Sequence, residues 1–498
     1  MSDNDLPTAW VHAPIHALIS QGGVFIDGDW IESKDQDPNG EVRLIQLADV
    51  GDGVFHNKSA RFLTKTKATK LRCTFLKKGD LLIARMPDPL GRACVFPLEG
   101  EERFVTVVDV CIIRTSADVA SPEFLKFAVN FLGTRNQIGD LQTGSTRKRI
   151  SRSNLASVTI PLPPLAEQRR IVAKIDELFS ELDAGEESLR KARRQLGVYR
   201  QSLLKQAFEG KLTASWRKQN PHLLESPDQL LNRIQAERQR RYLEELKLWE
   251  TYGKSGRKPG KPREFEFITA EEVSQLSHLP HGWLWVRFGN VLAIRSGDGL
   301  TASQMDGGQF PVYGGNGVSG FHGSYMFEDP KLVIGRVGAK CGITHITAAK
   351  SWVTDNALIC EFQVQSAELI FMKLLLNHLD LNKLSVSTAQ PVVSGSKLNP
   401  LPVPLCSLPE QREIVRLLDE QFTVIEQNER EIDTALKRSA ALRQSILKKA
   451  FTGQLVAQDP SDEPASALLE RIREERATHT LPKKIAKKPA TGRMSRKA

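Results

Sequence analysis

The sequence predicts an α+β protein in which two globular α/β domains are separated by an antiparallel pair of long coiled-coil helices, with a pseudo-two-fold internal repeat. Two observations predict this architecture. Residues 155–212 align without a gap to residues 398–455, 243 positions later, and 23 of the 58 aligned positions are identical. Each copy follows a stretch rich in glycine and short β-prone runs, a pattern typical of a compact domain. A repeat of this length is too large for a solenoid unit and indicates two half-proteins in one chain.

In each half of the chain, a segment rich in glycine and short β-prone runs is followed by one copy of the repeat. The Gly/Pro/Lys-rich stretch from Tyr252 has the composition of a linker, and the end of the chain is rich in lysine and arginine. The six predicted parts are a first globular domain (1–162), a central repeat helix with a short helix after it (163–251), a linker (252–278), a second globular domain (279–405), a C-terminal repeat helix with its own short helix (406–476) and a basic disordered tail (477–498).

Both copies of the repeat are predicted to be long helices, Leu165–Phe208 and Leu408–Phe451. Their apolar residues step by alternating threes and fours, the 3.5-residue period of a coiled-coil seam. About 44 residues at roughly 1.5 Å each give helices of about 65 Å. Matched seams favour antiparallel pairing of the two helices, and the alternative is a surface helix lying on a globular domain. The predicted helix-pairing seam consists of Ile171, Ile175, Leu178, Leu182, Leu189, Ile414, Leu418, Ile425, Ile432 and Leu442, and the same spacing adds Gly185, Tyr199 and Asn428.

The flanks of the helices carry start and stop signals. Pro164 and Glu167 suit the first turn of a helix, and Gly210 suits the position just past its end. Short charged helices are expected to follow both long helices. Ahead of each globular segment, Leu-Pro-x-x-Trp occurs once, ending at Trp10 and at Trp283. The repeat therefore extends beyond the helices.

Composition is that of an ordinary soluble globular protein, with 40% hydrophobic and 26% charged residues. No stretch has the apolar length of a membrane span, and the first residues do not resemble a signal peptide. The 6 cysteines form no CxxC pair and are expected to be reduced, mostly buried thiols. We therefore expect a cytoplasmic protein without membrane contacts.

The net charge of +10 favours polyanionic partners. The last 18 residues hold seven Lys/Arg and no acid, which leaves about +3 for the rest of the chain. This tail is expected to attract phosphates without sequence preference, and a purely solubilising end is an equal alternative.

Motifs for nucleotide or metal chemistry are missing from the sequence. No G-x-x-x-x-G-K-[S/T] loop, H-E-x-x-H pair, paired CxxC or Asn-Pro-Pro-aromatic motif occurs, and the histidines form no spaced cluster. Residues 315–320 match G-x-G-x-x-G, but the following residues are a poor helix start, so a tight turn in a binding loop is expected. We therefore predict no catalytic residue and no metal ligand.

Basic and polar residues instead gather in loops of the globular segments. A basic run extends from Lys58 to Lys78, and Gly144–Arg149 precedes the first long helix. Arginine and glutamine can bond base edges bidentately, whereas lysine and hydroxyl side chains suit phosphates; a solvated surface is the alternative for any one residue. The predicted DNA contacts are Arg85, Arg147 and Arg149 in the first domain and Arg336, Lys340 and Gln390 in the second.

With these features the chain resembles the specificity subunit of type I restriction-modification enzymes, in the enterobacterial K-type branch. The resemblance covers the whole chain in architecture. Its motifs are a proline-rich step and Leu-x-Glu-Gln helix start at Pro161–Gln168 and Pro404–Gln411, a helix end of the form Lys-x-Ala-Phe-x-Gly, the Leu-Pro-x-x-Trp openings, and Tyr313–Gly317 with Val353–Leu358 in the second domain. The first domain departs from that last pattern.

The resemblance implies a DNA-recognition subunit that is not catalytic by itself. Each target-recognition domain of this family contacts one part of a bipartite, asymmetric site in double-stranded DNA, and the paired helices set the spacing. Two modification subunits with S-adenosylmethionine would methylate adenine, and two restriction subunits with ATP and magnesium would cleave unmethylated DNA. No cofactor is expected on this chain.

Two rival interpretations remain at this point. A stand-alone DNA-binding or DNA-modifying protein would turn over DNA by itself with magnesium and S-adenosylmethionine. A coiled-coil scaffold would bind proteins through its globular parts and show no sequence-selective, salt-sensitive DNA binding.

Overall fold

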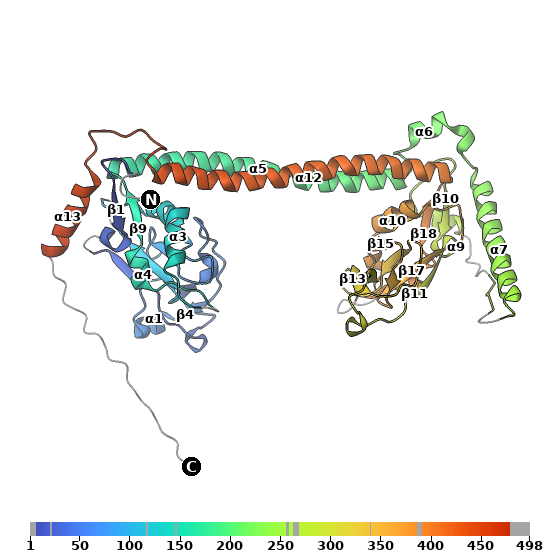
Figure 1. Cartoon of the computed structure of the whole chain (residues 1–498), viewed down its shortest axis with the longest axis horizontal. Coiled ribbons are helices and arrows are strands. Elements are labelled where there is room, and N and C mark those ends of the chain that lie inside the picture. The colour runs from blue at the N-terminus through green and yellow to red at the C-terminus, as the bar shows by residue number, and fades with distance from the viewer. Residues whose placement is uncertain are drawn as a thin grey trace, which may run out of the picture. The chain divides into compact units, whose positions relative to one another are not determined.

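The computed structural model describes residues 6–19, 22–115, 118–144, 147–254, 258–261, 268–338, 340–385 and 391–478. The chain divides into two compact units. Unit 1 comprises Met1–Leu189 and Thr434–Ala498, and unit 2 comprises Arg190–Asp433. Each unit combines one globular domain with one end of each long helix (Figure 1). Parts of the predicted linker (255–257 and 262–267) and residues 479–498 of the predicted tail lie outside the described residues.

The first globular domain holds a two-, a three- and a four-stranded sheet with short helices. Its strands are β1 (Val11–Pro14), β2 (Val24–Asp27), β3 (Val42–Ile45), β4 (Phe62–Leu63), β5 (Leu81–Ala84), β6 (Ala93–Val95), β7 (Phe104–Thr106), β8 (Val110–Arg114) and β9 (Thr159–Leu162). Its helices are α1 (Lys65–Leu71), α2 (Pro122–Asn130), α3 (Leu132–Asp140) and α4 (Arg152–Ser157), with 3-10 turns η2 (Ile15–Leu18), η3 (Ser33–Asp35) and η4 (Leu47–Asp49).

The second globular domain has the same kinds of sheet. Its strands are β10 (Leu284–Arg287), β11 (Leu292–Ser296), β12 (Phe310–Gly314), β13 (Gly317–His322), β14 (Leu332–Gly335), β15 (Thr344–Ile346), β16 (Trp352–Val353), β17 (Ala357–Phe362) and β18 (Pro402–Leu405). Its helices are α8 (Ala270–Ser274), α9 (Phe288–Val291), α10 (Leu369–His378) and α11 (Gly395–Leu398), with η6 (Ala302–Gln304) and η7 (Leu381–Leu384).

Strands β10–β18 repeat the pairing of β1–β9 one by one. The four-stranded sheets have the orders β2-β8-β5-β6 and β11-β17-β14-β15, and the three-stranded sheets β4-β3-β7 and β13-β12-β16. In both three-stranded sheets the second pair, β3 with β7 and β12 with β16, is parallel. The two domains therefore share one topology, although their sequences share little. They differ in loops: residues 46–61 connect β3 to β4, whereas only residues 315–316 connect β12 to β13.

Both four-stranded sheets are buried on both faces. In β5, Leu81 and Ile83 belong to the cluster that includes α2, and Leu82 and Ala84 belong to a second cluster on the opposite face. Burial on both faces explains why this strand is a continuous apolar run rather than an alternating one. One asparagine also ties each helix to the edge strand: Asn130 of α2 bonds both backbone groups of Ala93, and Asn377 of α10 bonds those of Thr344.

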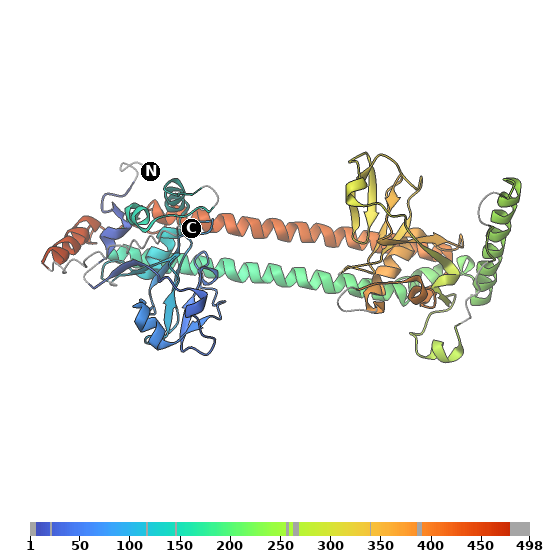
Figure 2. The same ribbon diagram turned by 90° about the horizontal axis from the view of Figure 1, so that it is seen from below.

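The long helices have the predicted bounds, α5 (Leu165–Phe208) and α12 (Leu408–Phe451). Within unit 2, Arg193 pairs with Asp433 and Arg200 with Glu426, so partner numbers fall in α12 as they rise in α5. The predicted antiparallel pairing is therefore confirmed, and both views show the helices alongside each other (Figures 1 and 2).

Contacts between the two helices obey the internal repeat. In unit 1, Arg443 pairs with Asp183 at 2.6 Å and lies 5.0 Å from the ring centroid of Phe179. In unit 2, Arg200 pairs with Glu426 at 3.6 Å and lies 4.7 Å from the ring centroid of Phe422. Each of these three residues is 243 positions from its counterpart. The pseudo-two-fold relation thus extends to individual side chains.

The residues of the predicted seam differ in burial, and four of them are exposed. Leu442 is 51% exposed, and its neighbour Arg443 contacts α5 instead. A strict 3.5-residue period drifts relative to a straight helix, so the inward position passes to the next residue. Gly185, Tyr199 and Asn428 are exposed as well, although the Tyr199 hydroxyl still donates to the side-chain carbonyl of Gln421 in α12 at 3.2 Å. The other predicted seam residues are covered: Ile171, Ile175, Ile414, Leu418, Ile425 and Ile432 are buried, and Leu178, Leu182 and Leu189 are half-buried.

The repeated motifs meet where each domain joins the helices. In unit 1, Trp10 donates its indole N–H to Glu167 of α5 at 2.9 Å, and Pro7 lies against Gly453, just past α12. Gly453 has φ +71°, where a side chain would be strained and would also overlap Pro7. The Leu-Pro-x-x-Trp motif therefore links the start of one long helix to the end of the other.

Unit 2 has the same junction. Trp283 donates to Glu410 of α12 at 3.0 Å, and Pro280 lies against Gly210, past the end of α5, with φ +68°. Two further helices, α6 (Ala214–Gln219) and α7 (Pro227–Thr251), and the turn η5 (Pro221–Leu223) follow α5.

A charged helix after each long helix docks on a globular domain, although α7, at 25 residues, is longer than the short helix expected there. Arg241 of α7 donates to the backbone carbonyl of Phe362 in β17, within unit 2. In unit 1, α13 (Ala465–Thr478) follows α12, and its Arg476 donates to the carbonyl of His16 at 2.8 Å. The helix that follows each long helix therefore binds the domain belonging to the other copy of the repeat.

All six cysteines are free thiols, as expected, and Cys73 alone among them is half-exposed. Burial raises the pKa of Cys94 and of Cys111 to about 12. Among the described residues, no helix has the length and apolar character of a membrane span.

Candidate nucleic-acid interface

The predicted contacts Arg85 and Arg336 occupy equivalent positions, directly after the central strands β5 and β14. Their backbone N–H groups donate to Asp109 and Asn356, both at 2.9 Å. The two arginines therefore leave the same point of the shared topology. The partners of their guanidinium groups differ.

Arg85 is held by its own domain. It donates to the carbonyls of Val108 at 2.7 Å and Ile150 at 3.2 Å, and its Nε lies 3.2 Å from the Asp27 carboxylate. Its side chain is only 14% exposed. This arrangement ties together the loops at one end of the sheet and leaves little of the guanidinium for a ligand.

Arg336 is held more loosely. It donates to the hydroxyl of Ser296 at 3.4 Å and to the carbonyl of Asp355 at 3.5 Å, both long hydrogen bonds. Ser296 ends β11 as Asp27 ends β2, so a neutral hydroxyl stands where the first domain has a carboxylate. More of this arginine is available for an outside partner.

Arg147 and Arg149 are exposed in a turn closed by two backbone hydrogen bonds between Thr143 and Arg149, at 2.8 and 3.0 Å. The turn lies beside Arg85, because Ile150 donates its backbone N–H to the Arg85 carbonyl at 3.1 Å. In the second domain, Val393 donates to Arg336 in the same way at 2.9 Å. The predicted contact Gln390 precedes Val393 by three positions in the sequence and lies outside the described residues.

The basic run around α1 is partly neutralised. Lys65 pairs with Glu102 at 2.6 Å, Lys67 with Asp35 at 2.9 Å and Lys78 with Glu99 at 2.6 Å. The run's other cations are exposed and form no ion pair within the described part of the chain; these are Lys58, Arg61, Lys70, Arg72 and Lys77. They leave a positive surface over the β3–β4 loop and α1.

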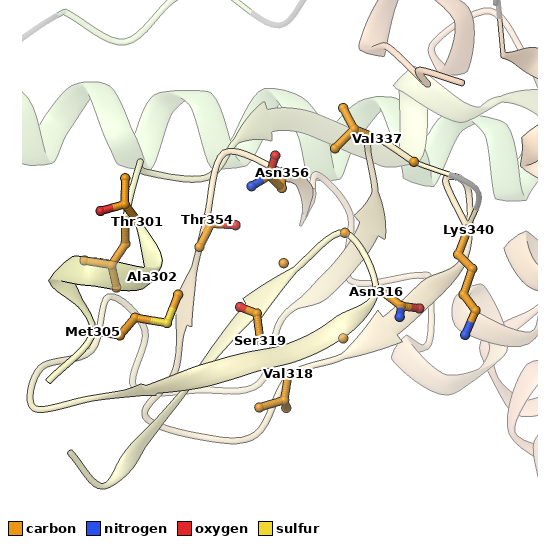
Figure 3. A pocket seen from close by; sticks show the side chains of 15 residues that line it. Thr301, Ala302, Met305, Asn316, Val318, Ser319, Val337, Lys340, Thr354 and Asn356 are labelled. Atoms are coloured by element: carbon orange, nitrogen blue, oxygen red, sulfur yellow. The ribbon is translucent and has the colours of Figure 1, made fainter. Parts of the chain in front are cut away.

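Lys340 lines a pocket of ≈ 740 Å³ in the second domain (Figure 3). The sequence predicts Lys340 as a contact but gives no sign of the pocket, which is lined in part by residues of Tyr313–Gly317 and Val353–Leu358. The lining residues are Leu300, Thr301, Ala302, Met305, Gly314, Gly315, Asn316, Gly317, Val318, Ser319, Val337, Gly338, Lys340, Thr354 and Asn356.

The G-x-G-x-x-G match at residues 315–320 lies in the β12–β13 hairpin that forms one wall of this pocket. A strand, β13, follows the glycines, whereas a dinucleotide site of this type needs a helix N-terminus there. The predicted tight turn is confirmed.

Two further features bear on function. Trp30 is 71% exposed in the first domain, an exposure that no sequence pattern signalled. Within the ranges that the structure describes, no three His, Cys, Asp or Glu side chains come close enough together to hold a metal ion.

Comparison with known proteins identifies the family. Residues 19–190 and 280–438 match the type I restriction modification DNA specificity domain. The EcoKI specificity subunit of Escherichia coli strain K12 is 26% identical over 507 residues, covering 96% of this chain and 97% of that relative. The StySPI specificity subunit of Salmonella potsdam is also 26% identical, with the same coverage.

A solved structure shares the fold. It comes from work on complex assembly and conformational transition of the type I R-M system, and the similarity has a TM-score of 0.62 at 19% identity, covering 90% of this chain and 99% of that chain. The family match spans most of both units, which also share their strand order. The chain therefore belongs to the DNA specificity subunits of type I restriction-modification systems.

Proposed function

We propose that this chain recognises a bipartite, asymmetric DNA site, with one globular domain contacting each part. The observation that carries the proposal is the contrast between a shared strand order and different outer loops. Equivalent scaffolds with different surfaces suit two different half-sites. Base-edge contacts would then specify each half-site, while phosphate contacts position the domain.

The chemistry would belong to partner subunits in the cytoplasm. Two modification subunits would bind S-adenosylmethionine and methylate an adenine, and two restriction subunits would use ATP and magnesium to cleave DNA. The chain itself would be non-catalytic and would hold no cofactor. The lack of nucleotide-, metal- and adenine-binding motifs in its sequence supports this division.

Within the proposed interface the described candidates divide by accessibility. Arg147 and Arg149 are exposed, Lys340 lines a pocket and Arg336 is loosely held, so these four would contact DNA. Arg85 would act by positioning the loop that carries Arg147 and Arg149, because it bonds Ile150 beside them. Gln390 stays a proposed contact.

The test exchanges residues 10–161 for the equivalent domain of a relative with a different site, within the complete complex. Sequencing of methylated adenines in the host should show that one part of the motif changes and the other stays. Domains that share few contacts have nearly additive recognition energies.

The matched control exchanges residues 283–404 instead, which should change the opposite part of the motif. A change of both parts by one exchange would contradict the two-domain proposal. A complex without sequence-selective, salt-sensitive DNA binding would contradict it too and would favour the scaffold interpretation.

A further inference from the structure

The second domain is open at a place that the first domain fills. In the three-stranded sheets, Ile45 pairs with Thr106, and the same register places Gly314 opposite Thr354. Ile45 is fully buried in a core cluster. Gly314 has no side chain, and it is one of the residues that line the ≈ 740 Å³ pocket.

Thr354 leaves a polar atom unpaired at this opening. Thr354 is 2% exposed, and its hydroxyl is buried without a hydrogen-bond partner among the described residues. The equivalent Thr106 hydroxyl donates to the Ile45 carbonyl at 3.0 Å. The fold can therefore satisfy this hydroxyl, and the second domain does not. An unpaired buried polar group is costly, and an acceptor atom on a ligand would relieve the cost.

The pocket lining favours an anionic ligand that also has apolar parts. It contains the cation Lys340 and the amide of Asn316, and no carboxylate. Lysine, hydroxyl and amide side chains are, together with arginine and backbone N–H groups, the groups that contact DNA phosphates. Met305 and Val318 supply apolar surface that suits a deoxyribose ring.

We propose that this pocket holds one sugar–phosphate unit of the DNA strand bound by the second domain. The hydroxyl of Thr354 and the ammonium group of Lys340 donate hydrogen bonds to its phosphate oxygens. The inference rests on the proposed function and deepens it. Such a contact would fix the position of the second domain on its half-site without discriminating bases.

Three substitutions test the pocket. Thr354→Val removes the hydroxyl at nearly constant shape, and Lys340→Gln removes the charge. Gly314→Ala fills the opening: an added Cβ would lie 3.5 Å from the Ser319 hydroxyl and 3.6 Å from the Thr354 hydroxyl, ordinary contact distances. Gly314 lies in a strand without a positive φ, so alanine fits its backbone.

Each variant is assembled into the complete complex, and its affinity is measured over a salt series for a duplex carrying the site and for an unrelated duplex. We expect each substitution to weaken binding of both duplexes by about tenfold. Lys340→Gln should also reduce the slope of affinity against salt by about one. The methylated motif should stay unchanged.

Neutral methylphosphonates placed singly along the site identify the contact directly. One position should weaken the wild-type complex and have no effect on the Lys340→Gln complex, because the charge pair is already lost. Controls are Lys383→Gln, an exposed lysine outside the pocket, and Thr106→Val, which removes the internal bond of the first domain. Both should keep wild-type DNA affinity, and Thr106→Val should lower thermal stability.

Relaxation of one motif position by Thr354→Val would overturn the inference in favour of base recognition. Wild-type affinity in all three variants, or the lack of any phosphate coupled to Lys340, would overturn it while leaving the proposed function intact. Failure of the wild-type complex to select any duplex would overturn both.

Discussion

Unit 1 and unit 2 each contain a buried glutamate at the same position of the repeat, but the two glutamates have different partners. Glu167 and Glu410 are equivalent residues of the repeat, and each accepts a hydrogen bond from the tryptophan of its own Leu-Pro-x-x-Trp motif. Glu167 accepts its second bond from neutral Gln458 at 2.6 Å. Glu410 instead pairs with the buried guanidinium of Arg217. The repeated motif fixes the carboxylate, and the segment after each long helix sets its electrostatic environment.

The outer sides of the two domains differ more than the junctions. The first domain carries the long β3–β4 loop and a basic α1, whereas the second has a two-residue hairpin turn and an open pocket. Strand order, helix-tethering asparagines and tryptophan–glutamate contacts are shared. The surfaces that join the helices are thus similar, and the loops on the rest of the two domains differ.

The largest effect is expected where the units are most alike. Ile175 and Leu418 are equivalent and fully buried, each in the core of its own unit. Burying a carboxylate at either site should cost more than about 4 kcal/mol, a large part of a typical domain's stability. Ile175→Asp and Leu418→Asp should each unfold their own unit, and the double substitution should abolish complex assembly. Circular dichroism and limited proteolysis measure the loss.

A matched control is Val198→Asp on α5, since Val198 is 71% exposed and should tolerate the charge. If Ile175→Asp unfolded its unit and Leu418→Asp left the other intact, the two helix ends would not be equivalent in energy.

The second prediction separates the two junctions. Glu410→Gln should cost about 3 kcal/mol of unfolding free energy, because Arg217, only 12% exposed, loses its counter-charge. Glu167→Gln should cost less than about 1 kcal/mol, because Gln458 can turn its amide and accept from the new side chain. Urea unfolding of both variants measures the difference. Arg217→Met combined with Glu410→Gln should recover part of the loss, and equal losses in the two single variants would refute the distinction.

The third prediction compares the equivalent arginines. Arg85→Ala should lower the free energy of unfolding by about 2 kcal/mol, because several internal hydrogen bonds are lost. Arg336→Ala should change stability by less than about 0.5 kcal/mol. It should instead cost about 1–3 kcal/mol of DNA binding and, if Arg336 contacts a base, relax one motif position. If Arg336→Ala lowered stability and left DNA binding unchanged, the main role of Arg336 would be its hydrogen bonds to Ser296 and Asp355.

The sequence predicts the helices well, because a gap-free repeat reports both bounds and pairing. Glu167 and Gly210 have the expected first-turn and past-the-end positions, since charge near a helix start and left-handed backbone past its end are local requirements. Leu442 shows the limit: the heptad spacing places it inside, but the accumulated drift of a real helix does not.

The candidate interface was less accessible to sequence reasoning. Arg85 and Arg336 look alike in sequence because each follows an apolar strand, yet Asp27 and Ser296, far away in the chain, decide how firmly each is held. The unpaired hydroxyl of Thr354 has no sequence signal either, because it depends on the residue opposite it in a parallel strand pair. Such features arise from tertiary pairing and not from local pattern.

The smallest expected effect is a pH dependence confined to the junction of unit 1. Burial raises the pKa of the Glu167 carboxyl above its usual value of 4.5, so the folded state binds this proton more tightly than the unfolded state. The resulting stabilisation is fully present below the unfolded pKa and is lost as pH rises through the folded pKa. Glu167→Gln cannot titrate, so the free energy of unfolding of the wild type minus that of the variant should fall from acid towards neutral pH and then level off. Other carboxylates contribute equally to both proteins and cancel in the difference. A difference that grew with rising pH would mean that the indole of Trp10 and the amide of Gln458 stabilise the charge by more than burial penalises it.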